Sequence, residues 1–202
     1  MKEEIEVKFL DVAHDVIRSK LEAAGAVCEQ PMRVMRRAII DYPDKRLSTS
    51  SDTGWGWVRI RDEGDKITCT YKHIAKDGND TIHEIEITVS SYEKAIEIFE
   101  AVGLKKHSEQ ETKRETWRID DVEVALDEWP WIPSYIEIEG SSESSIKAAA
   151  EKIGLSWADA LHGSSDRLYR TYYPKMGSEE SVSDMAQLTF GGGLPQWLKE
   201  RQ

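Results

Sequence analysis

Pairs of like-charged residues two positions apart recur along this sequence. The pairs are Glu4 and Glu6, Arg59 and Arg61, Glu84 and Glu86, and Glu137 and Glu139. Residues two apart lie on the same face of a strand, where like charges cost energy unless opposite charges or metal ions lie between them. Carboxylates hold Mg²⁺ or Mn²⁺ through hard oxygen ligands, while Arg and Lys neutralise phosphate oxygens. The charges therefore indicate a site for a polyphosphate that carries its own divalent metal ions.

The elements that position these charges are predicted to be strands with one charged and one apolar face. In residues 3–9, for example, the apolar Ile5, Val7 and Phe9 alternate with charged residues. The charged faces comprise Glu4, Glu6, Lys8, Arg59, Arg61, Lys72, Glu84, Glu86, Arg114, Arg118, Glu123, Asp127, Glu137 and Glu139. One reading is an open sheet with a solvated face on which mixed charges pair. If the sheet closes around them instead, the charges line a channel.

Helices are predicted between the strands over residues 11–25 and 91–103, and after the last strand over residues 141–154 and 156–173. Asp11 and Ser91 are the expected N-caps of the first two, and Gly25 and Gly103 their stops. These helices have to cover the apolar strand faces, since leaving them wet would forgo about 25 cal/mol per Å². Runs of strands broken by a few helices predict an α+β fold with a largely antiparallel sheet.

Length and composition favour one domain over residues 1–174, followed by an extension over residues 175–202. The extension is rich in Gly and Ser, so we expect it to be flexible and its removal to leave the fold intact. The net charge of -11 repels nucleic acid and anionic membranes, and neither is an expected partner. Without a long apolar run or a signal-peptide core, the expected location is cytoplasmic. Monomer and homodimer both remain open.

The N-terminal Glu4-x-Glu6-x-Lys8 resembles the ExExK signature of the CYTH superfamily, which includes class IV adenylyl cyclases and thiamine triphosphatases. The order of the later charges resembles the family too: Arg59-x-Arg61, Lys72, Glu84-x-Glu86, Arg114, Asp127, and Glu137-x-Glu139 followed by Gly140. Together these positions span residues 1–173. The resemblance implies the family fold, an eight-stranded antiparallel closed β tunnel (the triphosphate tunnel) with helices packed outside.

The resemblance also implies roles for individual residues. The implied ligands of Mg²⁺ or Mn²⁺ are Glu4, Glu6, Asp127, Glu137 and Glu139. The implied phosphate-binding residues are Lys8, Arg59, Arg61, Lys72, Arg114 and Arg118, and the candidate catalytic residues are Lys8, Glu84 and Glu86. One departure concerns the Lys-x-Arg that members often have: Thr112 stands at the Lys position, Lys113 should face the other side, and Arg118 is the expected replacement.

The leading hypothesis from the sequence is a metal-dependent triphosphatase. Its substrate would be inorganic triphosphate, a nucleoside triphosphate or thiamine triphosphate, and Trp57 is placed to contact a head group because it shares the parity of Arg59. A class IV adenylyl cyclase, which makes cyclic AMP and pyrophosphate from ATP, is the first alternative. A non-catalytic polyphosphate-binding or nucleotide-binding module is the second.

Overall fold

A computed structural model describes residues 5–49, 51–76 and 82–202. Glu4, an expected metal ligand, lies outside the described residues. The chain packs as two compact units. The first contains the described parts of residues 34–111 together with 181–189, and the second contains residues 5–33, 112–180 and 190–202.

The fold is α+β with an eight-stranded antiparallel sheet and helices, as the sequence predicted. The strands are β1 Ile5–Phe9, β2 Val27–Asp41, β3 Gly54–Asp62, β4 Ile67–Ala75, β5 Ile82–Val89, β6 Lys105–Ile119, β7 Val122–Glu128 and β8 Tyr135–Gly140. Their order in the sheet is β1-β8-β7-β6-β2-β3-β4-β5. A two-residue ninth strand, β9 Gln187–Leu188, pairs with β6 in parallel.

The helices are α1 His14–Ala23, α2 Tyr92–Ala101, α3 Glu143–Lys152, α4 Ser165–Tyr172 and α5 Gln196–Lys199, with 3-10 turns η1 Trp157–Asp159 and η2 Val182–Asp184. None of the helices in the described part of the chain has the length and apolar character needed to cross a membrane.

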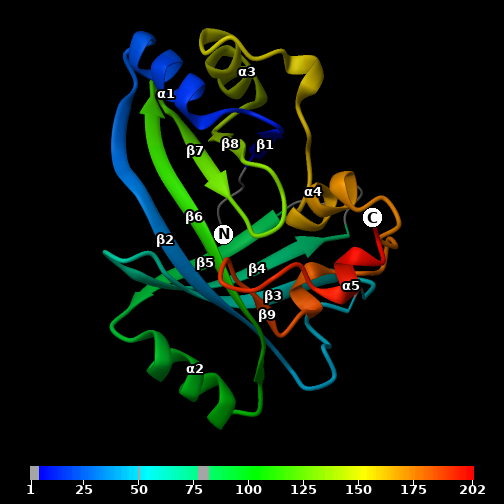
Figure 1. Cartoon of the computed structure of the whole chain (residues 1–202). Helices are drawn as coiled ribbons and strands as arrows, with labels where there is room; N and C mark the ends of the chain where they lie inside the picture. The colour runs from blue at the N-terminus through cyan, green and yellow to red at the C-terminus, as the bar shows by residue number, and fades with distance from the viewer. Residues whose placement is uncertain (1–4, 50, 77–81) are drawn as a thin grey trace. The chain divides into compact units, whose positions relative to one another are not determined.

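In the first unit, α2 covers one face of β2 and β3 (Figure 1). The buried core residues are Ala38, Ile40, Val58, Ile60, Tyr92, Ala95, Ile96 and Leu104. On β5, however, Ile85 is 55% exposed and Ile87 is 59% exposed, although helices were expected to cover every apolar face. A helix is about 10 Å wide and strands lie about 4.8 Å apart, so one helix covers about two strands. The apolar side of β5 therefore stays open at Ile85 and Ile87, although Val89 at the end of the strand packs partly against this core.

In the second unit, α1 and α3 cover one face of β1, β8 and β7 (Figure 1). The core joins Ile17 and Leu21 of α1 to Ile146, Ala149, Ala150 and Ile153 of α3, over Val7, Phe9, Val124, Leu126, Ile136 and Ile138 of the strands. Apolar residues therefore fill one face of these strands. The charged residues between them are left on the other face.

Two helix predictions need correction. Asp11 does not cap α1: the N-cap is Ala13, and Asp11 has a left-handed backbone (φ 54°) while its carboxylate accepts a hydrogen bond from the Tyr172 hydroxyl (2.9 Å). The helix predicted over residues 156–173 is broken, and only η1 and α4 form. Leu161 pairs instead with the backbone of Lys8, through N–H···O bonds of 2.9 and 2.8 Å. Ser91 does cap α2, accepting from the Lys94 amide (3.2 Å).

The segment after Lys175 was expected to be loosely attached, but it is packed. In the first unit, β9 pairs with β6 and the Ser108 hydroxyl donates to the Met185 carbonyl (2.6 Å). In the second unit, Arg201 forms an ion pair with Glu180. The apolar side chains of this segment, Val182, Leu188 and Leu198, are fully buried. Isolated apolar residues in a Gly- and Ser-rich stretch give no periodic signal, which is why composition alone indicated a linker.

Candidate functional site

The charged side chains gather in two clusters, one in each unit. The arginine cluster, in the first unit, consists of Arg37, Arg59, Arg61, Glu63, Lys72, Glu84 and Glu86. The carboxylate cluster, in the second unit, consists of Glu6, Lys8, Arg114, Arg118, Glu123, Asp127, Glu137 and Glu139.

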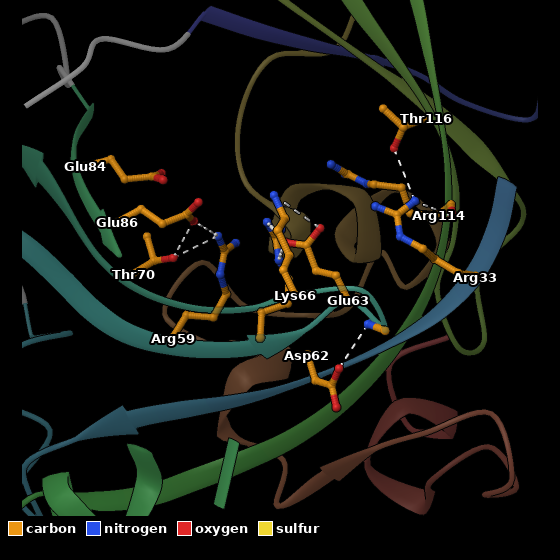
Figure 2. A network of polar contacts seen from close by, with 12 residues as sticks. Arg33, Arg59, Asp62, Glu63, Lys66, Thr70, Glu84, Glu86, Arg114 and Thr116 are labelled. Atoms are coloured by element: carbon orange, nitrogen blue, oxygen red, sulfur yellow. Dashed lines mark hydrogen bonds and ion pairs between the residues drawn. The ribbon is translucent and has the colours of Figure 1, made fainter. Parts of the chain in front are cut away.

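Pairing of β3 with β4 and of β4 with β5 creates the arginine cluster. Arg59 lies opposite Thr70, which in turn lies opposite Glu86, so all three share a face. The Thr70 hydroxyl donates to Glu86 (2.8 Å) and accepts a longer contact from Arg59 (3.4 Å), and the Arg59 guanidinium lies 3.8 Å from Glu86 (Figure 2). Glu86 thus meets Arg59 mainly through Thr70.

The other two cations predicted for this face each have a carboxylate partner. The Lys72 ammonium lies 2.7 Å from Glu84, directly across the β4–β5 pair. Arg61 donates to Glu63 at 2.7 and 2.9 Å. Glu63, which is 4% exposed, was read from the sequence only as part of a turn. It is a site residue that the turn signal hid.

Arg59 is buried beside two other arginines of the cluster. Burial, followed by the positive charges of Arg61 and Arg37, lowers the pKa of Arg59 to about 9. The guanidinium is still charged at neutral pH. Its Nε atom is buried and has no hydrogen-bond partner in the described part of the chain. A buried polar group of this kind costs free energy until it is paired, so the cluster favours an incoming anion.

The carboxylate cluster is centred on Lys8, which is 3% exposed. Its ammonium lies 2.6 Å from Glu6 and 3.1 Å from Glu137. Burial would lower the pKa of Lys8, but Glu137 and Glu6 outweigh it and raise the pKa above its ordinary value. Lys8 is therefore held protonated, and in this state it is a fixed positive charge rather than a base.

Arg114 links two strands of the same cluster. It donates to both oxygens of Asp127 (2.8 and 2.6 Å) and to Glu137 (2.9 Å). Burial would raise the pKa of Glu137, but Lys8 and Arg114 hold it well below its usual range. Asp127, only 1% exposed, is fixed by the two-pronged ion pair.

A row of three carboxylates crosses the second unit. Glu6 lies opposite Glu139 in the β1–β8 pair, and Glu139 lies opposite Glu123 in the β7–β8 pair. Directly opposed residues have Cβ atoms about 5 Å apart, where like charges are destabilising. As the side chains of the described residues lie, no three of them converge as ready metal ligands. The donor chemistry fits a hard divalent cation nonetheless, because all three are carboxylates in register on one face.

Arg118 and Lys113 lie on opposite faces of β6. Arg118 shares the face of Arg114 and binds Glu29 (3.1 Å) and Glu123 (3.3 Å). Lys113 alternates with Arg114 and forms an ion pair with Glu128 (2.8 Å). The structure thus brings Arg118, and not Lys113, to the carboxylate row.

Two arginines of β2 were missed from the sequence. Arg33, in the second unit, makes 3.4 Å contacts with the Thr116 hydroxyl and the Arg114 carbonyl (Figure 2). Arg37, in the first unit, lies opposite Arg61. Their four-residue spacing puts both on the same side of the strand. The shared face of Arg33 and Arg37 could have been predicted from their spacing. Arg36, which lies between them on the other face, made the pattern harder to recognise.

Comparison with known proteins identifies a family and several relatives. The family described as CYTH domain matches residues 2–173. A relative from Methanocaldococcus jannaschii, named provisionally as an adenylate cyclase, is 30% identical over 118 residues, covering 57% of this chain and 67% of the relative.

Two solved structures are similar in fold. One from Vibrio parahaemolyticus, also named provisionally as an adenylate cyclase, has a TM-score of 0.71 at 15% identity and covers 83% of this chain and 97% of its own. One from Hippeastrum, named provisionally as an adenylyl cyclase and described as having a dominant triphosphatase activity, has a TM-score of 0.55 at 13% identity and covers 85% and 96%.

Proposed function

Because this chain belongs to the CYTH domain family, we propose that it is a divalent-metal-dependent triphosphatase, with an arginine cluster for phosphate and a carboxylate cluster for the metal ion. The observation that carries the proposal is the opposition of like charges in both clusters: Arg37 faces Arg61, and Glu6 faces Glu139. A triphosphate would bring further negative charge to the first cluster, and a divalent metal ion further positive charge to the second. The strands would close into the tunnel typical of the family, as the resemblance implies.

The cations bind and orient the phosphate chain. Arg59 and Arg61 can each present a planar fork of N–H donors to phosphate oxygens, while Lys72 is a point charge. Arg114 and Arg118 supply further positive charge in the second unit. The carboxylate partners that these cations now have keep each side chain in place, and the more highly charged phosphate competes for the same donors.

Glu6, Glu137 and Glu139 are the residues that would hold Mg²⁺ or Mn²⁺, together with Glu4 and with Asp127 close by. When bound, the ion neutralises charge that develops on the phosphate oxygens. Lys8 helps to keep Glu137 ionised and places its own positive charge beside Glu6 and Glu137. The raised pKa of Lys8, which the sequence offered as a candidate catalytic residue, argues against a role for it as a proton acceptor.

In hydrolysis, water attacks the terminal phosphorus. A carboxylate near the phosphate chain would orient that water. Glu84 and Glu86 are the catalytic candidates in the first unit. Glu84 is already engaged by Lys72 at 2.7 Å, whereas Glu86 lies 3.8 Å from Arg59. We assign the orienting role to Glu86, because it is the carboxylate beside the phosphate-binding arginine that is less tightly paired.

Trp57 supports a substrate with an aromatic head group. It lies on β3 two residues before Arg59, on the same face, and stacks on Trp55 with ring centroids 5.3 Å apart. A nucleobase or thiazole ring can extend such a stack. Trp57→Ala should therefore weaken turnover of ATP or thiamine triphosphate and leave turnover of inorganic triphosphate unchanged.

The alternative function is a class IV adenylyl cyclase, which the provisional name of the Methanocaldococcus jannaschii relative favours. In that reaction the ribose 3′ oxygen attacks the α phosphorus and pyrophosphate leaves. The same cations and carboxylates would serve. Hydrolysis is preferred because it needs no pocket that holds the nucleoside with its ribose 3′ oxygen against the α phosphorus.

Phosphorus NMR of the chain with Mg²⁺ or Mn²⁺ tests the proposal. The substrates are inorganic triphosphate and, separately, ATP. Orthophosphate release is the expected result. Cyclic AMP with pyrophosphate would establish the cyclase instead, and tight binding without any product would establish a binding module. Glu139→Gln is the matched variant, and it should abolish both turnover and its dependence on divalent ions.

A further inference from the structure

Arg37 shares a face with the arginine cluster. It is directly opposite Arg61 in the β2–β3 pair, and residues paired in this way project on the same side of a sheet. The adjacent Ala38 lies opposite Ile60, and both are fully buried in the core under α2. Since alternate residues face opposite sides, Arg37 projects away from that core and onto the charged face.

The guanidinium groups of Arg37, Arg59 and Arg61 are close enough to influence one another. Arg37 is among the positive charges that lower the pKa of Arg59, after burial and Arg61. Arg61 has Glu63 as its partner at 2.7 Å, while among the described carboxylates Arg59 has the more distant Glu86 at 3.8 Å. Like charges opposed across strands are destabilising, so this arrangement favours a ligand with several negative charges.

We propose that Arg37 is a further phosphate-binding residue, which completes a three-arginine site for a multiply charged phosphate chain in the first unit. The inference rests on the proposed function and names a contact that the sequence did not identify. Three guanidinium forks on adjacent strands can engage successive phosphates of one chain, because each fork binds phosphate oxygens through two parallel N–H donors.

Binding of inorganic tripolyphosphate by isothermal titration calorimetry in EDTA tests the proposal on the full chain. Chelation removes the divalent ions that turnover needs, so the titration reports on the cations alone. Arg37→Ala should weaken binding by on the order of tenfold or more, since a hydrogen bond to a charged group is typically worth that much. Arg37→Lys keeps the positive charge but not the planar fork of donors. Its affinity for tripolyphosphate should therefore lie between those of the wild-type chain and Arg37→Ala.

Arg36→Ala is the matched control. It removes the same charge one residue away, from the opposite face, where Arg36 pairs with Glu93 (2.8 Å) and Asp62 (3.2 Å). It should bind tripolyphosphate as the wild-type chain does. Should Arg37→Ala fail to fold, Arg37→Gln, which is neutral but keeps a longer polar side chain, carries the same comparison.

One outcome supports the proposal and three overturn it. Weakening by Arg37→Ala but not by Arg36→Ala supports the site. Equal weakening by both, no weakening by Arg37→Ala, or no binding by the wild-type chain overturns it. The proposed function is judged separately by phosphate release in Mg²⁺ or Mn²⁺, so a chain that hydrolyses triphosphate without using Arg37 refutes this inference alone.

Discussion

Replacing Glu137 by Gln should destabilise the second unit through the ion pairs that it breaks. Glu137 joins Lys8 at 3.1 Å to Arg114 at 2.9 Å, and its side chain is 12% exposed. Removing one partner of a buried ion pair typically costs 3–5 kcal/mol. Lys8 keeps Glu6 and Arg114 keeps Asp127, so we expect the lower end, a loss of about 3 kcal/mol in the free energy of unfolding.

Thermal unfolding of the metal-free protein measures this loss. For a chain of about 200 residues, about 3 kcal/mol corresponds to a fall in Tm of about 6–12 °C. The folded pKa of Glu137 lies below its ordinary value of 4.5, so the stabilisation from its ionised form is complete above that pH and is lost as pH falls toward the folded pKa. The gap between wild type and Glu137→Gln should be full at pH 7 and narrow below about pH 4.5.

Asp120→Asn provides the control. Asp120 pairs with Lys152 at 2.9 Å, but the two side chains are 68% and 47% exposed, and exposed pairs contribute 0–1 kcal/mol. Its left-handed backbone (φ 53°) suits Asn as well. A Glu137→Gln protein that melts within 2 °C of wild type, or no lower than Asp120→Asn, would refute the buried ion network.

Three other outcomes are expected. Arg59→Ala should raise KM for triphosphate by about tenfold or more and also lower kcat, because the contact serves both ground and transition states; an unchanged KM in steady-state assays places Arg59 outside the site. Deleting residues 175–202 should lower Tm by about 10 °C or more, since it removes three fully buried apolar side chains, and an unchanged melting curve would restore the linker reading. Gly56→Ala should cost about 1–3 kcal/mol in chemical unfolding, because its Cβ would lie 2.4 Å from the Lys72 carbonyl oxygen, whereas Gly193→Ala, with open space around it, should be neutral.

The alternation of charged and apolar residues was enough to predict the strands and their faces. It works because the apolar side of a strand packs under helices: Val124 and Leu126 of β7 belong to the core under α1 and α3, while the alternate residues Glu123 and Asp127 lie on the other face. The same rule failed at Ile85 and Ile87, since alternation says which side is apolar but not whether a helix reaches it.

Pairing partners could not be predicted from the sequence. Parity identified Lys8 and Glu137 as site residues but not as neighbours, because register is set by contacts between strands more than 100 residues apart. For the same reason, nothing near residues 156–163 revealed that Leu161 leaves the helical pattern to pair with Lys8. The buried apolar residues after Lys175 are likewise isolated in the sequence, and their burial depends on the distant residues that they pack against.

The opposed charges make stability depend on ligands in a specific way. Arg37 opposite Arg61 weakens the free first unit, and Glu6 opposite Glu139 weakens the free second unit. An anion relieves only the first repulsion and a divalent cation only the second. On the proposed function, Mg²⁺ and triphosphate together should therefore raise Tm by more than the sum of their separate effects, since each also carries the charge that attracts the other. Strictly additive shifts in the Glu86→Gln protein would mean that Mg²⁺ and triphosphate bind independently of each other, against the proposed function.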